Sequence, residues 1–297
     1  SYENTKYYKE IFDKINFNPH KYSSKKDLLL IPSIDKKNIA KRYDDISPLN
    51  WLQKNKHIYK STSGSTGTPL SFPQSYEAEQ RYYAKYDFSW EVSIGRIFKD
   101  LKVAFLGGHK IKDINNNNSP FWAYNNLSKT IYFSSYHMSP QNIYYYVNKI
   151  KKYKPEVLAG YPSSISLISN YILNNNIKLK VPHIFLSSEN LTEQNKNRMI
   201  KAFRGKIYNF YGSTEDIGPT YICKNNMMHL IQTDNIVNKV DEDITLTHFG
   251  NYAFPLINYK IDDDLLITDK LCGCGVEGKI IEKIFGRDED YVLKKNG

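Results

Sequence analysis

The chain has 297 residues, 40% of them hydrophobic and 24% charged, values typical of a globular protein with about two domains. It contains no run of about 18 apolar residues and no charged, apolar leader, so we expect no membrane span and no secretion signal. The net charge of +10 comes from scattered basic residues without a nucleic-acid-binding motif, and we interpret it as general surface charge rather than as a sign of a nucleic-acid partner.

The first sixty residues predict helices that carry no chemistry. Residues 2–20 place apolar side chains at helical spacing, and Ser33-Ile34-Asp35 forms a cap before a second helix at 36–43. We therefore expect an amphipathic layer that packs on a core.

A run of hydroxyl and glycine residues at 61–69 is the first stretch that indicates a site. It lies between strand-like residues 58–60 and 70–72, so it should form the tip of a hairpin. Backbone N–H groups and hydroxyls in such a turn can bind a phosphate. The spacing matches neither the P-loop nor the dinucleotide fingerprint, and a flexible linker is the alternative interpretation.

Residues 130–215 repeat a strand, a short polar turn and a helix. This alternation predicts an α/β domain with a mainly parallel sheet. Ligands bind beyond the carboxyl ends of such strands, where the polar turns 160–163, 187–189 and 211–215 fall. Together the turns offer an aromatic face, hydroxyls and two carboxylates, which suit a purine, a phosphate and a metal ion.

The part beyond residue 220 predicts short strands and carries a second candidate site. Cys223, His229, Cys272 and Cys274 could bind Zn²⁺ as a tetrahedral set, because a Cys-x-Cys turn can place both sulfurs on one metal. Three buried free thiols and a surface histidine are the alternative. Three cysteines do not make a disulfide framework, which favours a reducing compartment, and we expect a cytoplasmic protein.

The hydroxyl run, the strand end Tyr211–Glu215 and the tail Gly286-Arg287-Asp288-Glu289-Asp290 occur in a fixed order. This set resembles the adenylate-forming superfamily of acyl-CoA synthetases, peptide-synthetase adenylation domains and luciferases. It is most similar to the phenylacetate–CoA ligase-like branch, especially to members found with capsular polysaccharide genes. The resemblance covers nearly the whole chain, from Tyr7 onward, and comparable Cys/His sets in that branch favour structural zinc.

The resemblance implies roles for individual residues. The phosphate loop includes Ser63, Gly64, Ser65, Thr66, Gly67 and Thr68, and the adenine pocket includes Ser188, Glu189, Tyr211, Gly212 and Ser213. Thr214 would contact the α-phosphate and Glu215 would bind Mg²⁺. Asp263 and Arg287 would hold the ribose, with Asp262 as the alternative to Asp263. Thr68 replaces the usual lysine, which removes one charge from the phosphate contact.

The resemblance also implies the activity, which is ATP-dependent activation of a carboxylic acid to an acyl-adenylate followed by transfer to a thiol of coenzyme A or a carrier protein. The acid is not identified, but its pocket should lie near the helix 75–91, Gly107-Gly108 and Tyr161-Pro162. His137 is either a contact to its carboxylate or a structural histidine. The alternatives are a catalytically incomplete module that binds AMP or ATP, and an acyl-protein synthetase that uses Cys223.

The domain division follows the same resemblance. We expect an α/β core at 1–219, a β-rich subdomain, a small distorted barrel, at 220–285, and a hinge at 286–297 near Glu289 or Asp290. The family's mobile lid domain, which carries a lysine for adenylation, would follow the hinge. We therefore expect the lid to be absent and this chain alone to be weakly active. The chain could also form a homodimer.

Overall fold

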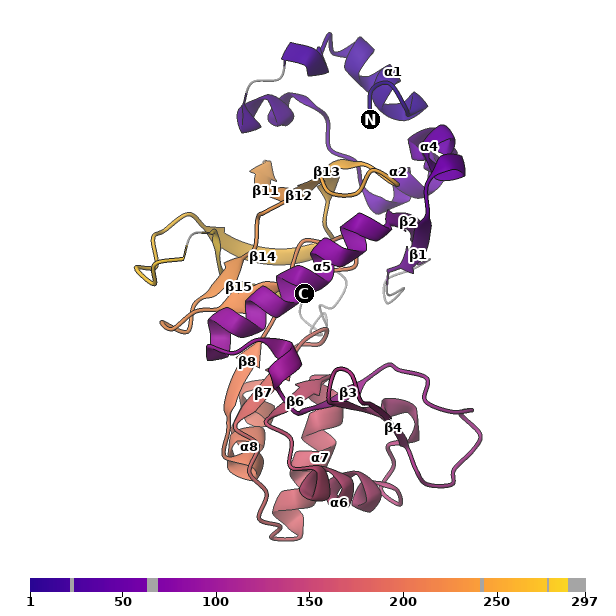
Figure 1. Ribbon diagram of the computed structural model, residues 1–297. Coiled ribbons are helices and arrows are strands. Elements are labelled where there is room, and N and C mark those ends of the chain that lie inside the picture. Colours follow the sequence, from indigo (N-terminus) through magenta and orange to yellow (C-terminus); the bar gives the residue numbers. More distant parts are fainter. Residues whose placement is uncertain (22–23, 63–68, 241–242, 277, 288–297) are drawn as a thin grey trace, which may run out of the picture. The chain divides into compact units, whose positions relative to one another are not determined.

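The computed structural model describes residues 1–21, 24–62, 69–240, 243–276 and 278–287, the side chain of residue 287 excepted (Figure 1). The chain forms two compact units that alternate along the sequence. The first unit comprises Ser1–Tyr86, Ser213–Pro219 and Met227–Gly297, and the second comprises Asp87–Gly212 and Thr220–Asn226. The domain boundaries expected at 219/220 and 285/286 stay predictions. Within the described ranges, no helix is long and apolar enough to cross a membrane.

The first unit combines short helices with antiparallel strands. Its helices are α1 (Lys6–Lys14), α2 (Lys36–Lys41), α3 (Tyr43–Ile46), α4 (Leu49–Lys54) and the first part of α5 (Tyr76–Ile94), with 3-10 turns at Pro19–Lys21 and Lys25–Leu30. Its strands are β1 (His57–Ser61), β2 (Ser71–Ser75), β10 (Met228–Leu230), β11 (Asn235–Val240), β12 (Asp243–His248), β13 (Leu256–Lys260), β14 (Asp263–Thr268) and β15 (Ile280–Arg287). β1 pairs with β2, β12 lies between β11 and β13, and β15 lies between β10 and β14.

The first helix is shorter than the predicted span 2–20. Thr5 caps its amino end by accepting a hydrogen bond from the Tyr8 amide at 3.4 Å, and the helix ends at Lys14. Asn16 has a φ of 53°, a left-handed conformation that stops an α-helix. Apolar periodicity identified the helix, whereas the turn that ends it left no periodic signal.

The second unit is the predicted α/β domain. Its helices are the rest of α5, α6 (Ile143–Tyr153), α7 (Pro162–Asn174) and α8 (Glu193–Phe203), with 3-10 turns at Phe98–Asp100 and Ser135–His137. Its strands are β3 (Val103–Gly107), β4 (Trp122–Asn125), β5 (Thr130–Ser134), β6 (Val157–Gly160), β7 (His183–Leu186), β8 (Lys206–Asn209) and β9 (Thr220–Ile222). The sheet order is β4-β5-β3-β6-β7-β8, and only β4 runs antiparallel to its neighbour.

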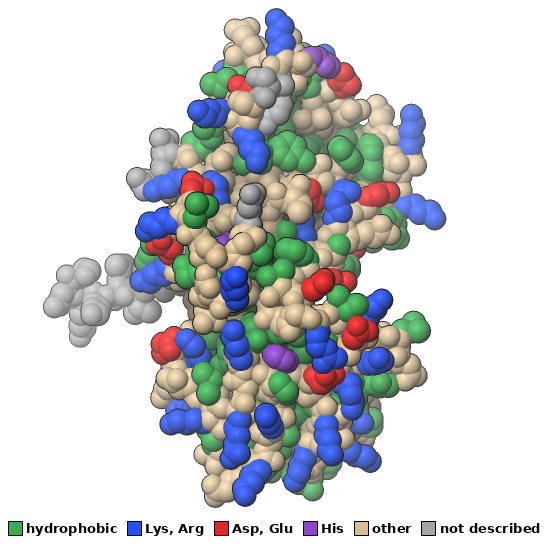
Figure 2. Space-filling view, turned by 60° about the vertical axis from the view of Figure 1, so that its left-hand side comes forward, with side chains coloured by type: hydrophobic (Ala, Val, Ile, Leu, Met, Phe, Trp, Pro, Cys, Tyr) green, Lys and Arg blue, Asp and Glu red, His purple; other side chains and the backbone are tan. Residues whose placement is uncertain are grey.

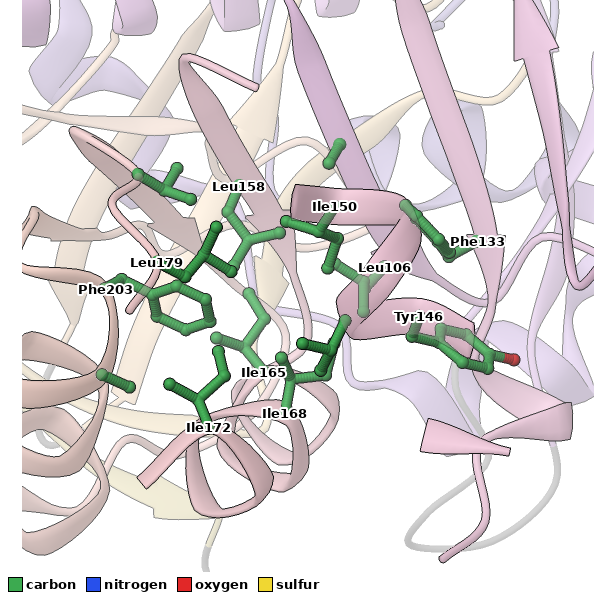
Figure 3. Packing of buried hydrophobic residues seen from close by; sticks show 14 of the residues in the cluster. Leu106, Phe133, Tyr146, Ile150, Leu158, Ile165, Ile168, Ile172, Leu179 and Phe203 are labelled. Carbon is green, nitrogen blue, oxygen red and sulfur yellow. The ribbon is translucent and has the colours of Figure 1, made fainter. Parts of the chain in front are cut away.

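Side chains from one face of this sheet pack against α6, α7 and α8 to form a hydrophobic core that is mainly aliphatic and includes Phe133, Tyr146 and Phe203. Leu106 and Leu158 of the sheet meet Ile150, Ile165 and other helix residues, as Figure 3 shows. Alternate strand residues point to opposite sides of a sheet, and those on the opposite face include several aromatic side chains. Phe185 there stacks on Tyr208 at 4.7 Å and on Trp90 of α5 at 4.3 Å between ring centroids. Both faces are thus covered, as a parallel sheet requires.

Candidate functional site

Polar turns follow the carboxyl ends of the parallel strands in the second unit. The turns after β6 and β7 are joined by Glu189, whose carboxylate accepts hydrogen bonds from the Ser163 amide at 2.8 Å and the Ser163 hydroxyl at 2.9 Å. Ser188 beside it has a φ of 72°, so this turn is tightly bent. The structure therefore brings the predicted turns 160–163 and 187–189 together at one edge of the sheet.

Two glycines at the same edge occupy positions where a side chain would clash with its neighbours. Gly160, the last residue of β6, has a φ of +146°, and a Cβ atom there would overlap the carbonyl oxygen of Leu106 on the neighbouring strand. A Cβ at Gly108, after β3, would lie 2.9 Å from the hydroxyl of Tyr161. The absence of a side chain at Gly108 lets Tyr161 approach the backbone of the β3 turn, and its absence at Gly160 lets β6 lie against the Leu106 backbone.

His137 in this unit is a structural residue. Its side chain is 3% exposed, its Nδ1 lies 2.7 Å from the Ser134 hydroxyl, and its Nε2 lies 3.1 Å from the Asp113 carbonyl oxygen. Both ring nitrogens are thus engaged within the protein, and the ring stacks on Phe121. Of the two roles considered for His137, the structure supports the structural one.

Tyr211 lies two residues after the end of β8. Its amide donates a hydrogen bond to the Thr220 hydroxyl at 2.8 Å, and its carbonyl oxygen accepts one from the Thr220 amide at 2.9 Å. These two bonds hold the backbone of Tyr211 in a defined position. The side chain is 8% exposed, so the aromatic residue predicted to face adenine is largely buried.

Ser213, Thr214 and Glu215, which follow Gly212, belong to the first unit. The Glu215 carboxylate accepts a hydrogen bond from the hydroxyl of Tyr259 at 3.2 Å. Burial and then the charge of Glu215 raise the pKa of Tyr259, so the phenol stays protonated and acts as the donor. Within the described residues, the buried hydroxyl of Ser213 has no hydrogen-bond partner. Mg²⁺ prefers oxygen ligands, and this segment offers the Glu215 carboxylate and an unpartnered buried hydroxyl two positions before it.

Asp216 anchors this segment in a buried cluster of charges. The Lys85 ammonium lies 2.7 Å from an Asp216 carboxylate oxygen and also pairs with Asp234. The Nε2 atom of His248 lies 3.0 Å from Asp216 and 3.5 Å from Asp234. Gly250 leaves room for the cluster, because a Cβ atom there would overlap the Asp234 carboxylate. Arg81, whose side chain is 41% exposed, adds a third cation 3.3 Å from the Asp234 carboxylate. The peptide next to Glu215 is therefore held by a charge cluster whose other members are nearly excluded from water.

Protonation of the cluster follows from its burial and charges. Burial lowers the pKa of His248, but hydrogen bonds and charges from Asp216 and Asp234 outweigh it, and the pKa is raised above its ordinary value. Burial raises the pKa of Asp234, but hydrogen bonds from His248 and Lys85 outweigh it, and the pKa is well below its usual range. The charged forms are thus favoured on both sides of the cluster.

The two residues predicted to hold the ribose lie opposite each other. Asp263 begins β14 and is the register partner of Arg287 at the end of β15. The predicted phosphate-loop residues 63–68 lie outside the described residues. On either side of them, the Thr62 amide bonds the Leu70 carbonyl oxygen at 3.0 Å and the Leu70 amide bonds the Thr62 hydroxyl at 3.0 Å. The predicted hairpin around this loop is confirmed by β1 and β2.

The predicted metal ligands of the first unit lie together. The ligand atoms of His229, Cys272 and Cys274 all lie within 4.8 Å of one another. The Cys274 sulfur is 3.7 Å from His229 Nε2, and a tetrahedral zinc would separate such atoms by about 3.6 Å. The other ring nitrogen of His229 faces the Gly278 carbonyl oxygen at 3.3 Å, as in a histidine oriented for metal binding. Cys223 is buried in the second unit, six positions before His229.

Comparison with known proteins finds similarity in sequence and in fold. Protein CapK of Staphylococcus aureus is 32% identical over 305 residues, which cover 99% of this chain and 66% of CapK. Two structures of 2-hydroxyisobutyryl-CoA ligase share the fold at 17% identity over 99% of this chain. One is an open conformation with 2-HIB-AMP and CoA (TM-score 0.72, 73% of that chain), and the other a postadenylation state with R3-HIB-AMP (TM-score 0.73, 66% of that chain). No family model matches.

The chain is similar in sequence to CapK and has the fold of 2-hydroxyisobutyryl-CoA ligase. It spans 66% of the length of CapK and 73% of the ligase chain in the open conformation. The predicted fold class is thereby confirmed, and the predicted resemblance to adenylate-forming enzymes agrees with these findings. Sequence reasoning missed Lys85, Asp216, Asp234 and His248. The one local signal was that Asp216 directly follows Glu215 in the superfamily segment.

We expect His248→Gln to destabilise the protein by about 2–4 kcal/mol, because it removes one cation from a buried cluster in which Lys85 already has to serve two carboxylates. The folded pKa of His248 lies above the unfolded value of about 6.5, so its contribution is complete below that pH and is lost as the pH rises through the folded pKa. The difference in melting temperature from the parent protein should therefore be larger at about pH 6 than at about pH 9. His20→Gln, at a histidine with 71% side-chain exposure, is the control. Equal differences at both pH values would contradict the assignment.

We expect Gly160→Ala to lower the melting temperature, because the new methyl group overlaps the Leu106 carbonyl and the residue keeps a positive φ, at a cost of about 1–3 kcal/mol or more. Gly95→Ala is the matched control. Gly95 also has a positive φ, 74°, but nothing lies within 4 Å of its Cβ position. Thermal unfolding of both variants separates the overlap from the φ strain, and similar losses would show that the overlap is relieved.

Proposed function

We propose that this chain is the nucleotide-binding part of an adenylate-forming ligase that activates a carboxylic acid with ATP. The single observation that carries the proposal is the fold, which this chain shares over 99% of its length with a ligase whose structures hold an acyl-adenylate and CoA. The segment 213–216 supports it, because a carboxylate, an unpartnered hydroxyl and a buried anchor follow one another there. The acyl group would then pass to a thiol of coenzyme A or of a carrier protein.

The chemistry follows from charge. A carboxylate oxygen attacks the α-phosphorus of ATP, the bond to the bridging oxygen breaks, and pyrophosphate leaves with the electron pair. Charge on the phosphate oxygens has to be neutralised, which is the main catalytic demand of phosphoryl chemistry. Mg²⁺ supplies part of this neutralisation when bound, and Glu215 with the Ser213 hydroxyl would hold it. Thr214 would donate its hydroxyl to the α-phosphate, and Tyr259 keeps Glu215 oriented through its hydrogen bond.

Nucleotide contacts follow the assignments of the superfamily. The adenine would be lined by Tyr211, Gly212, Ser188 and Glu189. The ribose hydroxyls would be bound by Asp263 and Arg287. The outer phosphates would be enclosed by residues 63–68. The register pairing of Asp263 with Arg287 favours this assignment over Asp262, because Asp262 precedes β14 and has no partner in the described strand pairing. A role in polysaccharide biosynthesis is part of the same proposal, through the resemblance to members found with capsular polysaccharide genes.

Glu215→Gln tests the assignment of the metal-binding carboxylate. We expect it to reduce acid-dependent exchange of pyrophosphate into ATP by about 10²-fold, because a charge that acts in the transition state is lost. Binding of AMP, measured by calorimetry, should change little. The assay uses a panel of aryl, fatty and amino acids. Glu77→Gln, at an exposed glutamate of α5, is the control. Exchange that is unchanged in Glu215→Gln would contradict the role, and nucleotide binding without exchange for any acid would favour a binding module.

We also propose a structural zinc held by His229, Cys272 and Cys274, with Cys223 as the fourth ligand. The 3.7 Å separation of sulfur and imidazole nitrogen supports it. Gly273 and Gly275, with φ values of 67° and 87°, allow the tight turn that brings both thiols of the Cys-x-Cys pair to one side. Burial lowers the pKa of His229, which keeps the imidazole neutral, as a ligand must be.

Metal analysis of the purified protein should find about one zinc per chain, and less than about half an equivalent would contradict the proposal. Cys274→Ser should lose the metal and lower the melting temperature. Cys272→Ser should have the same two effects. If the cysteines were only free thiols, this substitution should have little effect on stability, because Cys272 is only partly buried. A chelator should reproduce the loss of stability in the parent protein and have no effect in the two variants.

A further inference from the structure

The basic residues of the chain are concentrated in the second unit. This unit has eighteen Lys and Arg against seven Asp and Glu, a net charge of +11, whereas the whole chain has +10. In Figure 2 blue side chains gather over the part of the surface that this unit forms, with few red ones among them. The positive charge is therefore concentrated in one unit, whereas the sequence alone suggested that it is spread evenly over the protein.

Within the second unit, the charge lies at one edge of the parallel sheet. We define the amino edge as the segments that lead into the parallel strands, which are residues 96–102, 126–129, 151–156, 177–182 and 201–206. These segments contain twelve Lys and Arg but only two acidic residues, Asp100 and Glu156. Glu156 pairs with Arg96. The remaining basic residues are Lys99, Lys102, Lys129, Lys151, Lys152, Lys154, Lys178, Lys180, Lys201, Arg204 and Lys206, and all eleven are exposed.

Backbone pairing places these segments side by side. One row of register partners runs across five strands and consists of Thr130, Val103, Val157, His183 and Lys206. The Lys102 carbonyl oxygen accepts a hydrogen bond from the Glu156 amide at 2.8 Å, and the Pro182 carbonyl oxygen accepts one from the Lys206 amide at 2.9 Å. Five strands at a spacing of about 4.8 Å make a row of about 20 Å. Neighbouring charges along it lie within about one Debye length, about 8 Å at physiological salt, so they act together.

The opposite edge of the same sheet provides an internal comparison. The turns after the parallel strands, residues 107–113, 135–142, 161–163, 187–193 and 210–212, contain two basic and three acidic residues. A lysine-rich composition would load both edges alike. Helix dipoles favour cations at helix carboxyl ends, which explains Lys151, Lys152 and Lys201. They do not explain Lys102, Lys129 or Lys180, which lie in turns outside the helices.

An exposed apolar residue accompanies the charge. Leu127, at the tip of the β4–β5 hairpin, is 94% exposed, and it lies two residues before Lys129 on the amino edge. Tyr124 on the same hairpin is 50% exposed. A row of cations beside a protruding leucine and a tyrosine is the combination by which peripheral proteins bind an anionic bilayer, with the charges at the headgroups and the apolar tip below them.

We propose that the amino edge of the second unit binds the surface of a membrane that contains anionic lipids. The Lys102 ammonium donates a hydrogen bond to the Tyr153 carbonyl oxygen. The other ten exposed basic residues of the amino edge are nine lysines and one arginine. Sequence-reading and base-stacking surfaces rely on arginine and on free aromatic faces. The face of Tyr153 is covered by Lys102, 4.7 Å from the ring centroid. A lipid surface needs only dense point charges, and binding there leaves the polar turns at the opposite edge open.

Vesicle co-sedimentation of the full chain tests the proposal. The protein should sediment with phosphatidylcholine vesicles that contain about one third phosphatidylglycerol at about 0.1 M salt, and should not sediment with pure phosphatidylcholine or at about 0.5 M salt. The variant Lys151→Gln/Lys152→Gln/Lys178→Gln/Lys180→Gln should bind at least about tenfold more weakly, since each lysine at such a surface contributes about fivefold. Leu127→Ser should weaken binding by about tenfold through the lost apolar contact.

The matched control removes four exposed lysines from the first unit, Lys9→Gln/Lys14→Gln/Lys25→Gln/Lys26→Gln, and changes the net charge equally. It should retain vesicle binding, and circular dichroism should show all variants folded. Absence of binding to the anionic vesicles, or an equal loss in the control, would overturn the proposal. Fluorescence anisotropy with a duplex and a single-stranded oligonucleotide is the second arm, and binding to these that is tighter than to vesicles would assign the edge to nucleic acid instead.

Discussion

The first unit depends on one buried ammonium group that two carboxylates share. Lys85 comes from α5, Asp216 from the segment 213–219, and Asp234 from the turn before β11, so one cation joins three stretches that are far apart in sequence. A buried charge without its partner is several kcal/mol less stable, and each of the three stretches is therefore held by the other two. His248 adds the second cation and extends the network to the end of β12. Glu215 is one peptide bond away from Asp216, so its position is set by this network and by Tyr259 together.

Much of the second unit could be predicted from the sequence because its signals are local. Apolar strands alternate with helices there, and Pro155 and Pro162 mark where α6 ends and α7 begins. The polar turns at the strand ends followed from that topology. The antiparallel strand β4 was not predicted, because it has only four residues and most of them are exposed.

The buried network of the first unit was beyond sequence reasoning for a different reason. Lys85 and Asp216 are 131 positions apart, and each by itself has the composition of an ordinary surface residue. Only tertiary structure shows that they are excluded from water. The pairing of Asp263 with Arg287 is similar, since the register of two strands depends on bulges that no local pattern reveals. The assignment of both residues came from the superfamily resemblance, and the register gives it a geometric basis.

The polar turns of the second unit have a consequence for how the protein can change over evolutionary time. Each turn follows the end of a strand whose position is determined by the hydrophobic core on one face of the sheet and the aromatic side chains on the other. Substitutions in a turn leave that packing intact, so they are tolerated more easily than substitutions in the strands. Gly160 is an exception, because the backbone of the neighbouring strand leaves it no space for a side chain. Selection can thus reshape the polar turns one at a time while the scaffold beneath them is retained.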